Sequence, residues 1–194
     1  MNNIKTFENF NKQDMFTYIE NNDIKSVKNY INSGYDLNIK DEHGRIPLIY
    51  AVYANNVEIV QILLDSGVNI DMRDNHGCTA LINAVINTSE IEIIKLLLNA
   101  GADIDKQDNN GYTALIYAAY DNNRNVIELL LDYHADEFIL SVRDGSFYDY
   151  LNTENKKYFT QNYPTSVYNA ILHNYKKSFT EFVKDFNVKI KNNK

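Results

Sequence analysis

The side chains best suited to chemistry in this chain are one thiol and two histidines. Cys78 is the only cysteine and lies two residues after His76, while His43 occupies a similar polar stretch, Asp41-Glu42-His43-Gly44, earlier in the chain. A cysteine nucleophile needs a base within reach and a site that excludes water. Side chains this close together in a polar turn seldom meet in that way, and two histidines without further Cys or His partners make a poor zinc site. We therefore expect neither a catalytic nor a metal-binding role here.

A group of three aspartates, Asp103, Asp105 and Asp108, resembles a calcium-binding loop only in part. An EF-hand needs D-x-D-x-D-G spacing and a later glutamate, and Gln107 and the distant Gly111 break that pattern. Aspartates in such positions more often accept hydrogen bonds from the backbone of a turn. The sequence also contains no G-x-x-x-x-G-K-[ST] and no G-x-G-x-x-G motif. We expect no enzyme, no metal and no cofactor.

Composition places the chain among folded proteins of a reducing compartment. It has 194 residues, 44% of them hydrophobic, and a formal net charge of −7. One cysteine excludes an internal disulfide framework, and no run of about 18 apolar residues predicts a membrane-spanning helix. The first residues lack the apolar stretch of a signal peptide. We expect a cytoplasmic protein, in the host cytoplasm if a virus or phage encodes it.

Glycine spacing shows which elements must position these residues. The seven glycines fall into two evenly spaced series, Gly34, Gly67 and Gly101, and Gly44, Gly77, Gly111 and Gly145. The second series opens three similar segments, GRIPLIYA at 44–51, GCTALINA at 77–84 and GYTALIYA at 111–118. Each is followed by a second apolar run that ends in a leucine pair. Two apolar segments per period of about 33 are typical of a helical solenoid.

These segments resemble the ankyrin-repeat family, whose pattern is G-x-T-P-L-H-x-A, a second helix and then L-L-x-x-G-A-D. The sequence NAGADI at 99–104 is close to that ending. The resemblance implies an all-α ankyrin-repeat solenoid, with a helix-turn-helix and a hairpin finger in each repeat. It covers three full repeats over residues 40–138, and we expect a capping repeat before them at 13–39, after an N-terminal arm at 1–12.

Two departures from the family pattern carry structural expectations. Ile49, Ile82 and Ile116 replace the histidine that follows the leucine, so we expect apolar packing where the family has histidine hydrogen bonds. His134 replaces the glycine at the last helix end, and histidine adopts positive φ less readily than glycine. We therefore expect the final repeat to be irregular.

The C-terminal part has a different composition from the repeats. Residues 1–138 carry 10 Lys and Arg against 21 Asp and Glu, whereas residues 139–194 carry 9 against 5. We expect a partial fifth repeat at 139–152, C-terminal capping helices at 153–187 and a flexible basic tail at 188–194. The capping segment contains a short helix at 153–162 and an amphipathic helix from Thr165 to about Phe186, whose apolar residues follow heptad spacing.

By resemblance, the fingers and the inner face of the first helices bind a protein partner. Tyrosine is frequent at these positions and enriched in interfaces, because it offers a large contact area with little rotamer entropy. The expected partner-binding residues are Arg45, Tyr50, Tyr53, Arg73, Asn75, His76, Cys78, Asn83, Ile86, Asn109, Asn110, Tyr112, Tyr117 and Tyr120.

We therefore expect a non-enzymatic protein–protein interaction module that binds its partner on the concave ankyrin surface, with a role such as that of an adaptor. One alternative is a host-directed effector or inhibitor from a virus, phage or intracellular bacterium. Nucleic-acid binding is not expected, because the acidic repeats would repel phosphate.

A second alternative is a homodimeric scaffold joined through the C-terminal amphipathic helix. We expect a monomer, because three heptads are short for an independent coiled coil. Light scattering tests this: a monomeric mass at every concentration excludes the scaffold, and a dimeric mass contradicts the expectation.

The tyrosines provide a test of the binding surface. If Tyr50 and Tyr117 are surface residues, Tyr50→Ala combined with Tyr117→Ala abolishes partner capture and leaves the melting temperature almost unchanged. Loss of the fold in this variant would instead show that both rings belong to the core.

Overall fold

The computed structural model describes residues 12–87, 90–142 and 145–163, which form ten helices and no strand. The predicted all-α fold is confirmed. The chain divides after Asp103 into two compact units, which we describe separately. The helices are α1 (Lys12–Glu20), α2 (Ile24–Asn32), α3 (Pro47–Tyr53), α4 (Val57–Asp65), α5 (Ala80–Asn87), α6 (Ile91–Asn99), α7 (Ala114–Tyr120), α8 (Arg124–Asp132), α9 (Phe147–Tyr150) and α10 (Thr153–Asn162).

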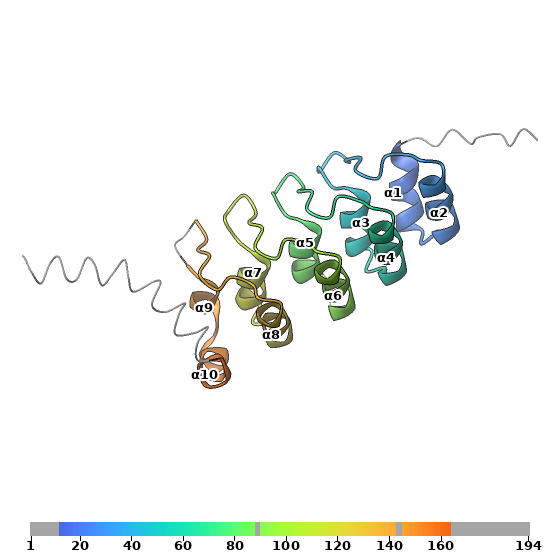
Figure 1. Ribbon diagram of the computed structural model, residues 1–194. Helices are drawn as coiled ribbons and strands as arrows, with labels where there is room; N and C mark the ends of the chain where they lie inside the picture. Colours follow the sequence, from blue (N-terminus) through green and yellow to red (C-terminus); the bar gives the residue numbers. More distant parts are fainter. Residues whose placement is uncertain (1–11, 88–89, 143–144, 164–194) are drawn as a thin grey trace, which may run out of the picture. The chain divides into compact units, whose positions relative to one another are not determined.

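The first unit is built from three helix pairs in two layers. The first helices α1, α3 and α5 pack side by side, and the second helices α2, α4 and α6 form the other layer (Figure 1). Ile49 and Ile82 are fully buried at the positions where the family has histidine, as expected. Burying such a side chain contributes about 1.5–3 kcal/mol, so these isoleucines replace polar contacts with apolar packing between repeats.

The second unit contains α7 to α10. Helix α7 packs against both α8 and α9, and Phe147 of the four-residue α9 is buried. Helix α10 covers the range expected for a short helix; Asn152 caps its N-terminus by accepting from the Asn155 N–H, and Phe159 is buried. The predicted amphipathic helix from Thr165 and the basic tail lie outside the described residues.

Helix ends show that one expectation was wrong. The backbone at His134 has φ of +64°, in the same left-handed region as Gly67 and Gly101 at the equivalent ends of α4 and α6. The Ala135 N–H donates to the Leu130 carbonyl oxygen at 3.0 Å, as the Ala102 N–H does to Leu97. The last full repeat therefore ends like the others, because this bond and the burial of Ala135 outweigh a backbone cost of about 1–2 kcal/mol.

A hairpin finger precedes each of α3, α5 and α7 (Figure 1). An aspartate organises each of these three fingers. One carboxylate oxygen of Asp41 accepts from two backbone N–H groups of its own finger, at 2.9 and 2.8 Å. Asp74 and Asp108 each bind two amides at the equivalent positions, at 2.8–2.9 Å. Hydrogen bonds to a charged group contribute about 1.5–3 kcal/mol each, so these aspartates stabilise the fingers. The expectation that Asp108 binds backbone amides is confirmed.

The second carboxylate oxygen of each aspartate binds a different side chain. Asp41 accepts from the Arg45 guanidinium at 2.7 and 2.8 Å, and Asp74 accepts from the Asn83 amide at 3.3 Å. Asp108 accepts from the Tyr117 hydroxyl at 2.7 Å. Asn83 and Tyr117 belong to α5 and α7, so these contacts tie the finger to the helix that follows it.

The stability that Asp41 contributes to its finger depends on pH, because the carboxyl must be ionised. Burial opposes the charged form, but the Arg45 guanidinium and the backbone amides of Arg45 and His43 outweigh it and hold the pKa of the Asp41 carboxyl below its usual value. A carboxyl whose pKa is lowered by folding adds stability above its unfolded pKa, and that stability is lost as pH falls through the folded pKa.

We expect Asp41→Asn to lower the free energy of unfolding by about 1–2 kcal/mol at pH 7, because the variant loses the charged contact with Arg45. The difference from the unmodified protein should be constant above about pH 5 and shrink as the pH falls below about 4. Urea unfolding measured from pH 3 to 8 tests this.

Glu92→Gln is the matched control, because Glu92 is exposed on α6 and its loss removes the same charge outside the fingers. A penalty for Asp41→Asn that does not change with pH would contradict the assignment.

Candidate functional site

The expected binding residues lie on the fingers and first helices of both units, but two of them are not on the surface. Cys78 is 6% exposed and Asn83 is 2% exposed, so the structure offers neither side chain as part of the expected binding surface. The Cys78 N–H donates to Asp74, which turns the chain inward after the finger tip. The Asn83 amide donates to the Thr79 carbonyl oxygen at 3.0 Å as well as to Asp74, and its oxygen accepts from the Tyr53 hydroxyl at 2.9 Å.

In the first unit, Arg45 lies among aromatic rings. Its guanidinium carbon is 4.6 Å from the centre of the Tyr50 ring and 5.6 Å from that of the Tyr53 ring. The Arg45 Nη2 group donates to the Tyr50 hydroxyl oxygen at 3.2 Å. The Tyr50 ring also packs 4.8 Å from Phe16 of α1. Burial raises the pKa of both tyrosine hydroxyls although the Arg45 cation opposes it, so both remain neutral at physiological pH.

In the second unit, four rings form what we call the tyrosine cluster: Tyr112, Tyr117, Tyr120 and Tyr150. The ring centres of Tyr112 and Tyr117 are 5.3 Å apart, those of Tyr112 and Tyr150 are 5.7 Å apart, and those of Tyr120 and Tyr150 are 6.3 Å apart. The Tyr150 hydroxyl lies 2.8 Å from the Ser141 hydroxyl and 3.4 Å from that of Tyr112. Three of the rings are half-buried, whereas Tyr120 is 65% exposed.

Tyr150 and Ser141 were absent from the sequence-based set. Tyr150 stands one repeat period after Tyr117, and Ser141 stands one period after Asp108. Extending the period into the partial fifth repeat would have found both. Ser141 takes the place that aspartate has in the other fingers and contacts Tyr150 of α9, so a hydroxyl pair replaces the carboxylate contact.

The structure also revises the expected effect of the double variant. Tyr50 packs on Phe16 and binds Arg45, and Tyr117 donates to the finger carboxylate of Asp108. Replacing both with alanine removes these contacts, so we expect a lower melting temperature rather than an unchanged one. Tyr53 and Tyr120 are better probes of binding, since both are exposed.

One repeat position carries an exposed apolar side chain in three repeats, and we call these residues the apolar set. Tyr53 and Tyr120 are the last residues of α3 and α7, and Ile86 occupies the same repeat position in α5. Their exposed fractions are 44%, 65% and 39%, respectively. Each of these repeats therefore presents one large apolar side chain at the same place, on a helix whose other apolar residues are mostly buried.

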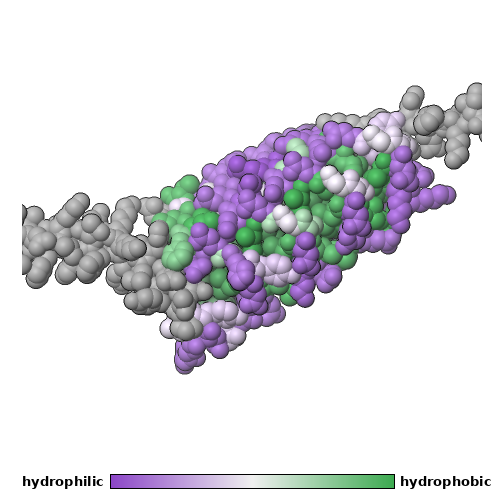
Figure 2. All heavy atoms as spheres, viewed as in Figure 1, coloured by the Kyte–Doolittle hydropathy of each residue, from purple (hydrophilic) through white to green (hydrophobic). Residues whose placement is uncertain are grey.

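The finger tips of the first unit form a polar surface, and Figure 2 shows hydrophilic residues gathered over these fingers. The Asn75 N–H donates to the His43 carbonyl oxygen at 2.9 Å, and the Lys40 ammonium donates to that of Arg73 at 2.8 Å, so successive fingers are joined. Five of the expected finger residues are exposed, namely Arg73, Asn75, His76, Asn109 and Asn110, whereas Arg45 and Tyr112 are half-buried.

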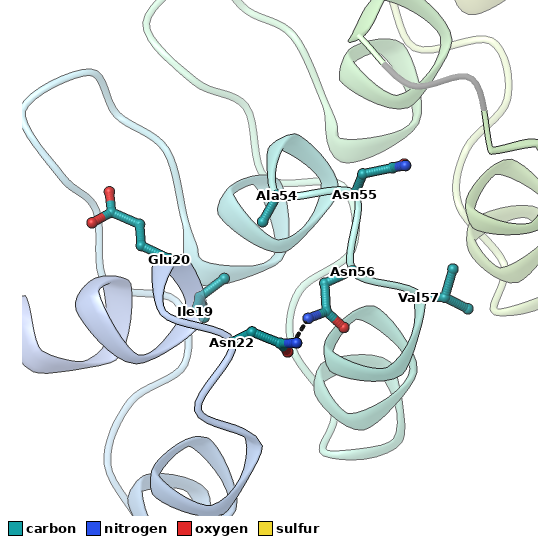
Figure 3. Close-up of a pocket in the computed structure, with 7 residues that line it drawn as sticks. All are labelled: Ile19, Glu20, Asn22, Ala54, Asn55, Asn56 and Val57. Atoms are coloured by element: carbon teal, nitrogen blue, oxygen red, sulfur yellow. Dashed lines mark hydrogen bonds between the residues drawn. The ribbon is translucent and has the colours of Figure 1, made fainter.

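The surface is also hollowed away from the expected binding residues. One hollow of about 340 Å³ in the first unit lies where α1 ends and α4 begins, lined by Ile19, Glu20, Asn22, Ala54, Asn55, Asn56 and Val57 (Figure 3). Asn56 donates to Asn22 across it. Its only ionisable side chain is Glu20, so it offers no acid–base pair. Within the described residues, no three His, Cys, Asp or Glu side chains come together as metal ligands.

The helices of the described residues are too short and too polar for any of them to cross a membrane. A search of curated proteins finds no match to this chain. A family model for ankyrin repeats (3 copies) matches residues 15–108, and a second model for ankyrin repeats (many copies) matches residues 88–131. Ankyrin repeats are generally protein–protein interaction modules and typically non-enzymatic. With its helix pairs, fingers and repeat period in agreement with these matches, the chain belongs to the ankyrin-repeat family.

Proposed function

We propose that the protein is a non-enzymatic module that binds a protein partner on its first helices and fingers. The observation that carries this proposal is the exposed apolar set, Tyr53, Ile86 and Tyr120, at one repeat position. Single exposed apolar residues are ordinary, but their recurrence at one position of successive repeats gives each repeat the same kind of contact surface.

The chemistry of this set suits a protein partner better than a small substrate. Tyrosine buries a large area on contact and keeps a polar hydroxyl for the rim, and its two side-chain torsions cost little entropy to order. In the first unit the polar finger tips lie beside these helices, which matches the apolar centre and polar rim of protein interfaces.

The same surface would serve an adaptor or a host-directed inhibitor, and the difference lies in the partner rather than in the fold. For either role we place the protein in the cytoplasm, as a monomer.

Site-specific photo-cross-linking tests the surface directly. A photoreactive phenylalanine analogue in place of Tyr120 should form a covalent adduct with a specific protein in extracts of the cells that produce the chain. Tyr133 is the matched control, because it is an exposed tyrosine of the same unit at the end of α8, outside the first helices.

The adduct should be specific to the apolar set. We expect Tyr120→Ala to weaken binding of the identified partner by at least about tenfold, as hot-spot tyrosines do, with an unchanged melting temperature. Equal cross-linking from positions 120 and 133, or no loss of affinity in Tyr120→Ala, would contradict the proposal.

A further inference from the structure

We propose that the tyrosine cluster of the second unit binds an arginine side chain of the protein partner. This inference rests on the proposed function, since it uses the same surface, and it names the chemical group that the surface recognises. It is carried by a comparison between two repeats of this chain.

If the capping repeat at 13–39 is counted as the first, the second and fourth repeats place related residues at matching positions. Asp41, Arg45, Tyr50 and Tyr53 stand two repeat periods before Asp108, Tyr112, Tyr117 and Tyr120, respectively. In the second repeat, Arg45 places its guanidinium over the rings of Tyr50 and Tyr53 and binds the carboxylate of Asp41. That repeat therefore supplies a cation to its own aromatic pair.

The fourth repeat has the same aspartate and the same aromatic pair as the second, but a tyrosine occupies the position of the arginine. Tyr112 stands at the position of Arg45, and Tyr150 of α9 adds a fourth ring. The Asp108 carboxylate binds the Tyr117 hydroxyl at 2.7 Å, so this finger is held without an arginine. The cluster thus contains four tyrosine rings, and Tyr120, its most exposed ring, is open to a cation from another molecule.

Arginine fits this arrangement better than lysine does. A planar guanidinium stacks on tyrosine rings and still has N–H groups to donate to nearby hydroxyl oxygens, whereas an ammonium is more strongly hydrated. The hydroxyl of the half-buried Tyr150, which lies 2.8 Å from that of the buried Ser141, provides an acceptor at the cluster. Tyrosine rings of this unit already pair with cations elsewhere: Arg124 lies 4.1 Å from the Tyr158 ring centre.

Charge around the cluster favours a cation. Asp121 directly follows Tyr120 and is exposed, and Asp149 directly precedes Tyr150 and is also exposed. Two carboxylates beside these rings favour the approach of a basic group over that of an acidic one.

The test uses the full-length protein with ¹³C-labelled tyrosine rings and two short peptides. One peptide carries a single arginine, and the other carries citrulline, which has the same shape without the charge. We expect the arginine peptide to shift the ring signals of Tyr120 and Tyr150 and to bind at least about fivefold more tightly than the citrulline peptide, as a cation–π contact requires. Added salt should weaken the binding.

Matched variants locate the site. Tyr120→Leu should remove the response, whereas Tyr133→Leu should keep it. Tyr112→Arg recreates the arrangement of the second repeat, so its own guanidinium should occupy the rings and block the peptide. Tyr112→Leu, which leaves three rings without adding a cation, should still bind.

Three results would overturn the inference: equal binding of the citrulline peptide, binding that survives Tyr120→Leu, or tyrosine signals that do not respond to the arginine peptide. The proposed function stands separately, because a cross-linked partner at Tyr120 together with no arginine response would retain protein binding and remove only the arginine site.

Discussion

An aspartate carboxylate that accepts two backbone amides of its own finger is the interaction on which the inner face depends. It recurs in three fingers with nearly the same distances, at Asp41, Asp74 and Asp108. Because the acceptor is charged and largely buried, the finger has few alternative conformations of comparable energy. The residues that follow each finger, including the tyrosines of the first helices, are therefore held in defined positions.

The same carboxylate also explains how repeats with one backbone acquire different surfaces. Its second oxygen accepts from Arg45 in the second repeat, from Asn83 in the third and from Tyr117 in the fourth. The side chain that binds this oxygen is held against the finger, so a different side chain is left exposed in each repeat. Arg45 covers the rings of its own repeat, whereas Tyr117 leaves the cluster around Tyr120 open on its outer side.

Local backbone rules predicted the helix ends well, except at His134. His134 was expected to disturb its repeat, because a residue with a Cβ is strained at positive φ. The structure places it in the left-handed region nonetheless, since the Ala135–Leu130 hydrogen bond and the buried Ala135 require that turn. A cost of about 1–2 kcal/mol is small beside the packing of a whole repeat.

Periodicity in the sequence alone determined the repeat family, the helix order and the apolar positions, because a solenoid repeats its local contacts at a constant spacing. It also indicated which positions belong to the inner face. Only the tertiary structure decided which of those side chains are accessible. Cys78 and Asn83 are buried, the Asn83 amide donates to the carboxylate of Asp74, and Tyr120 remains exposed. Exposure depends on contacts between residues in different elements, such as Tyr53 with Asn83 and Tyr150 with Tyr112, and a repeat pattern read one period at a time does not contain them.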